Sequence, residues 1–147
     1  MKSYIDKNLQ AGELIHYKAH VHWCIFVIPV LLLLVGIHYY PSSNVFEHLI
    51  GITTLPVGVF TLLRSLYLKI GTQYVVTSKR VILKQGILSR DAMELMLNKC
   101  EGLSINQGFI GRLLGFGTIL LTTGGATNVF RYVTNPIKFR NAINEQL

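Results

Sequence analysis

Charged residues are scarce in this chain: they make up 14% of its 147 residues, against roughly 25% in soluble domains. Acidic residues are the rarest, with 7 Asp and Glu against 14 Lys and Arg. A chain of this length has room for one domain, or for a membrane anchor and a small domain. Because half of the residues are hydrophobic, the shortage of charge indicates that part of the chain lies in lipid.

Cysteine is also rare: the chain has two, and their spacing matches neither a disulfide framework nor a metal or redox motif. Cys24 stands near the start of an apolar run, and Cys100 lies far away in the more polar half. Neither belongs to a Cys-x-x-Cys pair or to a His/Cys cluster with zinc spacing. We therefore expect no disulfide framework, no redox or zinc site, and no cofactor.

The second half of the chain lacks the residue groupings of an enzyme. Its acidic residues are dispersed and form no close general acid–base pair; they are Asp91, Glu94, Glu101 and Glu145. The glycines within residues 108–117 have neither the Gly-x-Gly-x-x-Gly spacing nor the Gly-Lys-Ser/Thr ending of a phosphate loop. Basic residues are not interleaved with aromatics as in nucleic-acid-binding motifs. These patterns favour a non-enzymatic protein with no nucleic-acid partner.

Two long hydrophobic runs dominate the first half. Residues 23–40 read WCIFVIPVLLLLVGIHYY and contain no charge; as a helix they span roughly 27 Å, close to the hydrocarbon thickness of a bilayer. Residues 45–63 read VFEHLIGITTLPVGVFTLL, followed by Arg64. A secretory signal peptide is the alternative for the first run, but the polar lead is long and no Ala-x-Ala-like site follows. We predict antiparallel transmembrane helices at 23–40 and 45–66, joined by an external turn at 41–44.

The distribution of Lys and Arg predicts the orientation of this hairpin. The turn at 41–44 has neither residue, whereas residues 1–22 have three and residues 64–147 have eleven. By the positive-inside rule both termini are cytoplasmic. Residues 1–22 then form a cytoplasmic N-terminal segment, and residues 70–147 form a cytoplasmic domain.

A stripe of small residues follows one face of the second helix at spacings of three or four. Its members are Gly51, Thr54, Gly58, Thr61 and Ser65. Small side chains allow close helix contact in lipid. The stripe therefore predicts a helix-packing seam, either for the first helix of the same chain or for a second copy in a homo-oligomer.

The remaining residues favour short strands followed by one helix. YVVTSKRVILKQG, at residues 74–86, predicts a hairpin with strands 74–77 and 81–85. Further apolar alternation predicts strands near 87–89, 93–97, 103–105, 118–123 and 128–134, the last two joined by a turn at Gly124 and Gly125. Asn135 and Pro136 then predict the start of a helix, whose buried face we expect to hold Phe139, Ala142, Ile143 and Leu147. This order is typical of a pleckstrin-homology (PH)-like curved antiparallel barrel capped by a C-terminal helix.

A glycine-punctuated apolar segment, residues 108–117, interrupts the strands. We interpret it as a helical turn. Its apolar side chains either plug one end of the barrel or dip into the nearby bilayer, with Arg112 at headgroup level; they are Phe109, Ile110, Leu113, Leu114 and Phe116.

Four motifs follow one another along the chain: GELIHYKAHVHW (12–23), YVVTSKRVILKQG (74–86), QGFIGRLLGFG (107–117) and NPIKFRNAI (135–143). In this order they resemble motifs of the bacterial PH-domain membrane proteins of the YdbS-like (DUF304) family. Ser78 stands where Asn is common in that family, which is a minor departure. The resemblance implies a two-helix anchor in the bacterial cytoplasmic (inner) membrane and a cytoplasmic PH-like domain. It implies no defined reaction.

Three histidines precede the first hydrophobic run. His16, His20 and His22 would share one face of a strand, and His16 and His20 could pair on a helix. Such clusters can bind metal or respond to pH. The plainer interpretation is an interfacial segment whose imidazoles meet water, headgroups or backbone.

Basic residues outnumber acidic ones by ten to four over residues 69–147. Next to an anionic leaflet, each nearby cation contributes on the order of 1 kcal/mol of attraction. The candidates for contact with lipid or a partner are Lys79, Arg80, Lys84, Arg90 and Arg112. Eukaryotic PH domains commonly place such a cluster at their first hairpin, which this set partly resembles.

Two hypotheses of function lead. In the first, the chain is a membrane-anchored PH-like interaction module that scaffolds or regulates a membrane assembly, with another membrane protein or a second copy as its partner. In the second, it binds or senses anionic lipid through its basic face. A small enzyme or metal protein built around the three histidines is the third.

Overall fold

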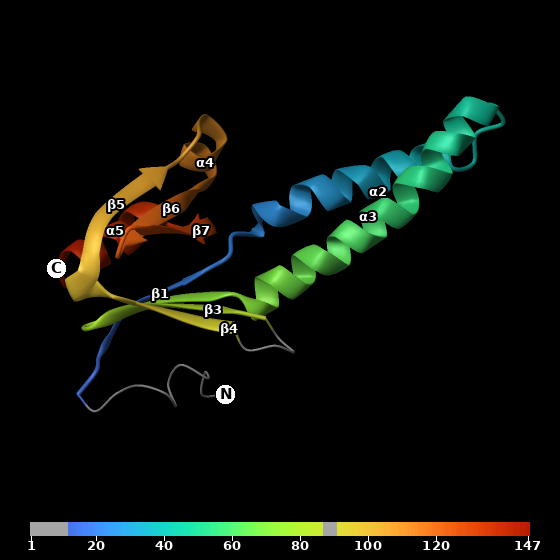
Figure 1. Cartoon of the computed structure of the whole chain (residues 1–147). Coiled ribbons are helices and arrows are strands. Elements are labelled where there is room, and N and C mark those ends of the chain that lie inside the picture. Colours follow the sequence, from blue (N-terminus) through green and yellow to red (C-terminus); the bar gives the residue numbers. More distant parts are fainter. Residues whose placement is uncertain (1–11, 87–90) are drawn as a thin grey trace.

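The computed structural model describes residues 12–86 and 91–147, which form a helical hairpin and a β-rich domain (Figure 1). The hairpin consists of the 3₁₀ helix η1 (Trp23–Phe26), α2 (Val27–Tyr39) and α3 (Val45–Gly71). Asn44 caps α3, its Oδ1 accepting from the backbone N–H of Phe46 at 3.1 Å. Among the described helices, α3 is long and apolar enough to cross a membrane, whereas η1 and α2 together are shorter.

The first helix differs from the continuous helix predicted at 23–40, because its start is a 3₁₀ turn. Pro29 has no N–H to donate to the carbonyl of Ile25, four residues earlier. That carbonyl instead accepts from the Ser65 hydroxyl of α3 at 3.1 Å. Because of the proline, the carbonyl of Ile25 is available to accept a hydrogen bond that joins the two helices.

Small residues let α2 and α3 approach closely. A Cβ added to Gly51 would lie 2.5 Å from the backbone nitrogen of Tyr40, and one added to Gly58 would lie 2.9 Å from the side chain of Leu33. The hydroxyls of Thr54 and Thr61 donate hydrogen bonds to backbone carbonyls one turn earlier in the same helix. Since α2 of the same chain fills this seam, a second copy has no access to it.

The first sheet has the strand order β1-β2-β3-β4, all antiparallel. Its strands are β1 (Ile15–His20), β2 (Gln73–Thr77), β3 (Arg80–Gln85) and β4 (Asp91–Met96). The predicted hairpin at 74–86 is confirmed as β2 and β3, while the strand predicted at 87–89 lies outside the described residues. Strand β1 comes before the helices, so the helical hairpin is inserted between the first two strands of this sheet.

The second sheet has the order β5-β6-β7, formed by Cys100–Asn106, Phe116–Thr123 and Ala126–Thr134. Helix η2 (Leu97–Lys99) leads into it, and α4 (Phe109–Leu114) connects β5 to β6. Gly124 and Gly125 both have positive φ, as the predicted turn requires. Among the described residues, an isolated antiparallel bridge between Val21 and Val133 links the segment after β1 to β7 of the second sheet. The antiparallel sheets agree with the PH-like prediction, and their closure into a curved barrel stays a prediction.

Helix α5 (Pro136–Asn144) covers the core between the sheets. Phe139 and Ile143 are fully buried, and Ala142 is nearly so, as predicted. Leu147 is 64% exposed, so its predicted place in the core is wrong: α5 ends at Asn144, and the helical spacing no longer applies beyond it. The fold as described fits a PH-like domain.

Candidate functional site

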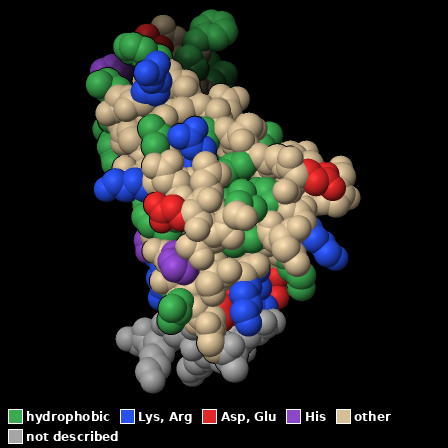
Figure 2. Space-filling model, turned by 90° about the vertical axis from the view of Figure 1, so that its left-hand side faces the viewer, with side chains coloured by type: hydrophobic (Ala, Val, Ile, Leu, Met, Phe, Trp, Pro, Cys, Tyr) green, Lys and Arg blue, Asp and Glu red, His purple; other side chains and the backbone are tan. Residues whose placement is uncertain are grey.

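The predicted basic set does not converge on one site. Lys79 is exposed at the β2–β3 turn, and Lys84 is half-buried opposite Gln73, beside the end of α3. Strand β3 rises about 3.3 Å per residue, so the step from Lys79 to Lys84 along it spans roughly 16 Å. Arg112 is exposed on α4, and Arg90 lies outside the described residues. On the face shown in Figure 2, Lys and Arg side chains are likewise spread over the surface.

Arg80 is buried and forms an ion pair inside the domain. Its Nε donates to Oε1 of Glu13 at 2.9 Å, and its Nη2 donates to Oε2 at 2.8 Å. Nη1 donates to the partly exposed Glu94. The hydrogen bond to Glu13 is the largest of the effects that raise the pKa of Arg80 above its ordinary value. Arg80 is therefore a structural residue rather than part of a lipid-binding face.

Thr77 completes this network at the β2–β3 turn. Its hydroxyl donates to Glu13 at 2.6 Å and accepts from the backbone N–H of Arg80 at 3.1 Å. Glu13 precedes the helical hairpin, whereas Thr77 and Arg80 follow it. The network thus ties the two sides of the inserted helices together.

The three histidines are separated rather than clustered. His16 and His20 are exposed on β1, while His22 follows the strand and is buried, so the prediction of one shared face is wrong for His22. Its Nδ1 accepts from the N–H of Cys24 at 3.2 Å, which caps η1. Burial first, and then the charge of Lys69, lower the pKa of His22 below its ordinary value. Within residues 12–86 and 91–147 no group of three potential metal ligands occurs.

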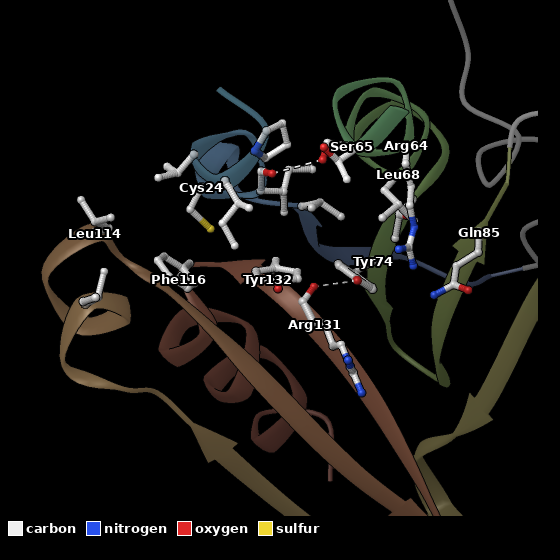
Figure 3. Close-up of a pocket in the computed structure, with 18 of the residues that line it drawn as sticks. Cys24, Arg64, Ser65, Leu68, Tyr74, Gln85, Leu114, Phe116, Arg131 and Tyr132 are labelled. Atoms are coloured by element: carbon white, nitrogen blue, oxygen red, sulfur yellow. Dashed lines mark hydrogen bonds between the residues drawn. The ribbon is translucent and has the colours of Figure 1, made fainter. Parts of the chain in front are cut away.

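A cleft of about 730 Å³ lies where the helical hairpin meets the β domain (Figure 3). Its walls come from η1, α2 and α3 on one side and from α4, β6 and β7 on the other. Cys24, Leu114 and Phe116 lie at one end, which is mainly apolar. Arg64 and Gln85 lie at the other end, and Tyr74 and Arg131 line the β-domain wall next to it; none of these four residues was predicted as a site residue.

Tyr74 forms the floor of the polar end and is firmly held. Its hydroxyl donates to the carbonyl of Arg131 at 2.9 Å, which connects the two sheets. Burial raises the pKa of Tyr74 to about 12. The phenol is therefore neutral at physiological pH and contributes no charge to the cleft.

Helix α4 presents apolar side chains outward instead of plugging the core. Phe109 is 85% exposed and Leu113 is 77% exposed, with Ile110 at 65%. Phe116 alone packs inward, stacking on His22 with ring centroids 5.2 Å apart. The predicted plug is wrong for α4, because Gly111 rather than a large residue faces the domain: a Cβ there would lie 2.6 Å from the carbonyl oxygen of Phe116.

Sequence reasoning missed the role of Glu13 and the position of Arg131. Glu13 stands within the first of the four motifs, and Arg80, its partner in the ion pair, stands within the second. The one available signal was that both residues belong to motifs of the same family. Arg131 stands in a strand whose alternation predicts only that its side chain points outward. Which neighbour it faces depends on how the two sheets meet.

Comparison with known proteins gives one match. A family model described as a bacterial PH domain matches residues 23–147. No curated protein and no solved structure matches the chain.

Proposed function

Because the chain belongs to the bacterial PH-domain family, we propose that it is a membrane-anchored, non-enzymatic module that presents a PH-like domain at the cytoplasmic face of the inner membrane. PH domains are in general non-catalytic interaction modules that bind lipids or proteins. The motif residues Glu13, Thr77 and Arg80 meet in one network, which supports the narrower assignment to YdbS-like (DUF304) proteins.

The main support for membrane anchoring is the exposed apolar surface of α3. Only 17% of its most apolar 18-residue stretch is buried, and Phe60, Leu63 and Ile70 are each more than half exposed. A core helix of a soluble protein would bury such residues. Strand β2 starts two residues after α3 ends, so the anchor holds the sheet close to the membrane surface. In this proposal α2 is the second span, shortened by its 3₁₀ start.

Fractionation and reporter fusions test the anchoring. The chain should stay with membranes after alkaline carbonate extraction. A fluorescent protein fused after Leu147 should fluoresce, and alkaline phosphatase fused at the same position should be inactive, since both termini are cytoplasmic. Active phosphatase at that position, or an untagged chain in the soluble fraction, would overturn the proposal.

The partner we propose is another membrane protein or a second copy of the chain, which the module scaffolds or regulates. The seam of α3 is filled internally, so contact must use the outer faces, where Phe46 and Phe60 are 79% and 69% exposed. Crosslinking in native membranes followed by mass spectrometry should recover such a partner. Recovery of uncrosslinked monomer alone would contradict this role.

A second candidate function, binding to anionic lipid, is favoured by α4. Its exposed apolar residues surround Arg112, and Ile110 and Leu114 line the cleft opposite the base of α2. We expect amide exchange in α4 to be slower in nanodiscs with phosphatidylglycerol than with phosphatidylcholine alone. Arg112→Gln should remove that difference and Lys79→Gln should keep it. Equal exchange in both lipids would exclude this candidate.

A further inference from the structure

We propose that the cleft between the helical hairpin and the β domain binds one phosphate-bearing membrane lipid, with Arg64 and Arg131 at its headgroup and the apolar end around its acyl chain. This inference rests on the proposed membrane anchoring. It differs from binding through the β2–β3 hairpin, where Arg80 is already occupied by Glu13.

The cleft has the size and polarity that such a ligand requires. Its volume of about 730 Å³ lies within the roughly 300–1,000 Å³ of pockets that hold small molecules. The described residues that line it include two arginines and no carboxylate. A phosphate would therefore meet cations without a competing anion, and guanidinium groups suit phosphate oxygens geometrically.

The two ends of the cleft match the two parts of a lipid. Arg64 descends from α3 at the end that also holds Gln85, and Arg131 lines the opposite wall from β7, whereas Cys24 and Leu114 line the other end (Figure 3). That apolar end borders Val27 and Ile28, which are 41% and 68% exposed on α2. The apolar wall is thus continuous with the surface that the hairpin turns to the bilayer, so a lipid could enter from the membrane.

The backbone at the cleft is strained in a manner typical of functional sites. Tyr132 lines the cleft with a φ of 55°, a conformation uncommon for an aromatic residue. It lies where the β6–β7 register shifts, and its carbonyl accepts from the N–H of His22 at 2.7 Å. Bulges of this kind re-aim side chains and occur preferentially beside binding sites. Here the irregularity places Tyr132 between the sheet and η1.

The test uses the full chain in mild detergent, titrated with phosphatidylglycerol and followed by native mass spectrometry. Arg64→Gln/Arg131→Gln should weaken binding about tenfold or more, since each arginine supplies charge-assisted hydrogen bonds. The matched control Lys79→Gln/Lys138→Gln removes the same charge outside the cleft and should change the Kd by less than about twofold. An equal loss in both double variants would mean that binding is non-specific, and would overturn the proposal.

Two further experiments test whether binding needs the shape of the cleft as well as its charge, and whether it needs a lipid rather than a free phosphate. Val129→Trp keeps the charge but fills the cleft, because Val129 lines it from β7 and is 40% exposed; it should also abolish binding. Soluble glycerol phosphate should not compete, because it lacks the acyl chain. Full binding by Val129→Trp, or effective competition by glycerol phosphate, would refute a lipid in the cleft. If the variants remain in the membrane fraction while binding lipid like the wild type, this inference fails and the anchoring stands.

Discussion

Arg80 holds Glu13 in a bidentate ion pair across 67 residues of sequence, with Nε 2.9 Å from Oε1 and Nη2 2.8 Å from Oε2. The whole helical hairpin lies between the two residues in sequence, yet their side chains are 9% and 0% exposed. The pair closes the sheet around the inserted helical hairpin. The need to pair with Glu13 explains why Arg80 stands in the β2–β3 hairpin, soon after the second hydrophobic run.

Removing either partner of this pair should strongly destabilise the domain. Arg80→Ala leaves the Glu13 carboxylate buried and uncompensated, which costs about 3–5 kcal/mol. Lys79→Ala, at the next position but exposed, should change the free energy of unfolding by less than about 0.5 kcal/mol. Thermal and denaturant unfolding in mild detergent measures both, and similar stability of the two variants would contradict the structural role of Arg80.

The Glu13→Ala/Arg80→Ala double variant should lose less stability than the sum of the single variants. Residues in one buried network are coupled by roughly 0.5–3 kcal/mol. The coupling is measured by a double-mutant cycle from the same unfolding curves. Strict additivity would show that the two side chains act independently.

Stability should fall on acidification through His22. Its pKa in the folded chain lies below the ordinary 6.5, so the unfolded chain binds the extra proton first as the pH falls. The contribution of neutral His22 is therefore complete above about pH 6.5 and is lost progressively below it. His22→Asn keeps an acceptor for the Cys24 N–H without titrating, and its Tm should decline less from about pH 7.5 to about pH 5. Identical declines in the two proteins would exclude His22 as the cause.

Gly51→Ala should separate α2 from α3. The new Cβ would lie 2.5 Å from the backbone nitrogen of Tyr40, and overpacking of this kind costs about 1–3 kcal/mol. Gly108→Ala is the matched control, because a Cβ there meets nothing within 4 Å. A lower Tm for Gly51→Ala alone is the expected result. Equal melting temperatures would argue against close packing at this point of the seam.

Helix α4 should lie at the level of the lipid headgroups and upper acyl chains. In a Trp23→Phe background the chain has no other tryptophan, so Phe109→Trp becomes a single reporter on α4. Brominated lipids should quench its fluorescence, whereas Lys79→Trp, at the far end of the β2–β3 hairpin, should be unaffected. Equal quenching at the two positions would contradict the orientation of the domain proposed above.

Local patterns were enough to predict most of the elements. The alternation of Tyr74 to Gln85 predicts a hairpin because side chains in a strand point to opposite faces with a period of two. Asn135 and Pro136 predict the start of α5 because proline suits the first helical turn, and Gly51 and Gly58 predict close helix packing from spacing alone. Each of these signals operates over a few residues and so can be identified directly in the chain.

The functional surface depends instead on which distant segments come together. Period and charge identify Lys79, Arg80 and Lys84 as similar cations. In the fold, however, Arg80 is buried by its ion pair with Glu13, and the length of the β2–β3 hairpin places Lys79 far from the helical hairpin. Arg64 and Arg131 line one cleft only because the fold brings α3 and β7 to its two walls, although the two residues are almost seventy positions apart in the chain. Hydrophobic periodicity dictates which side of an element is apolar, whereas the neighbour that covers it is selected by packing of the whole chain.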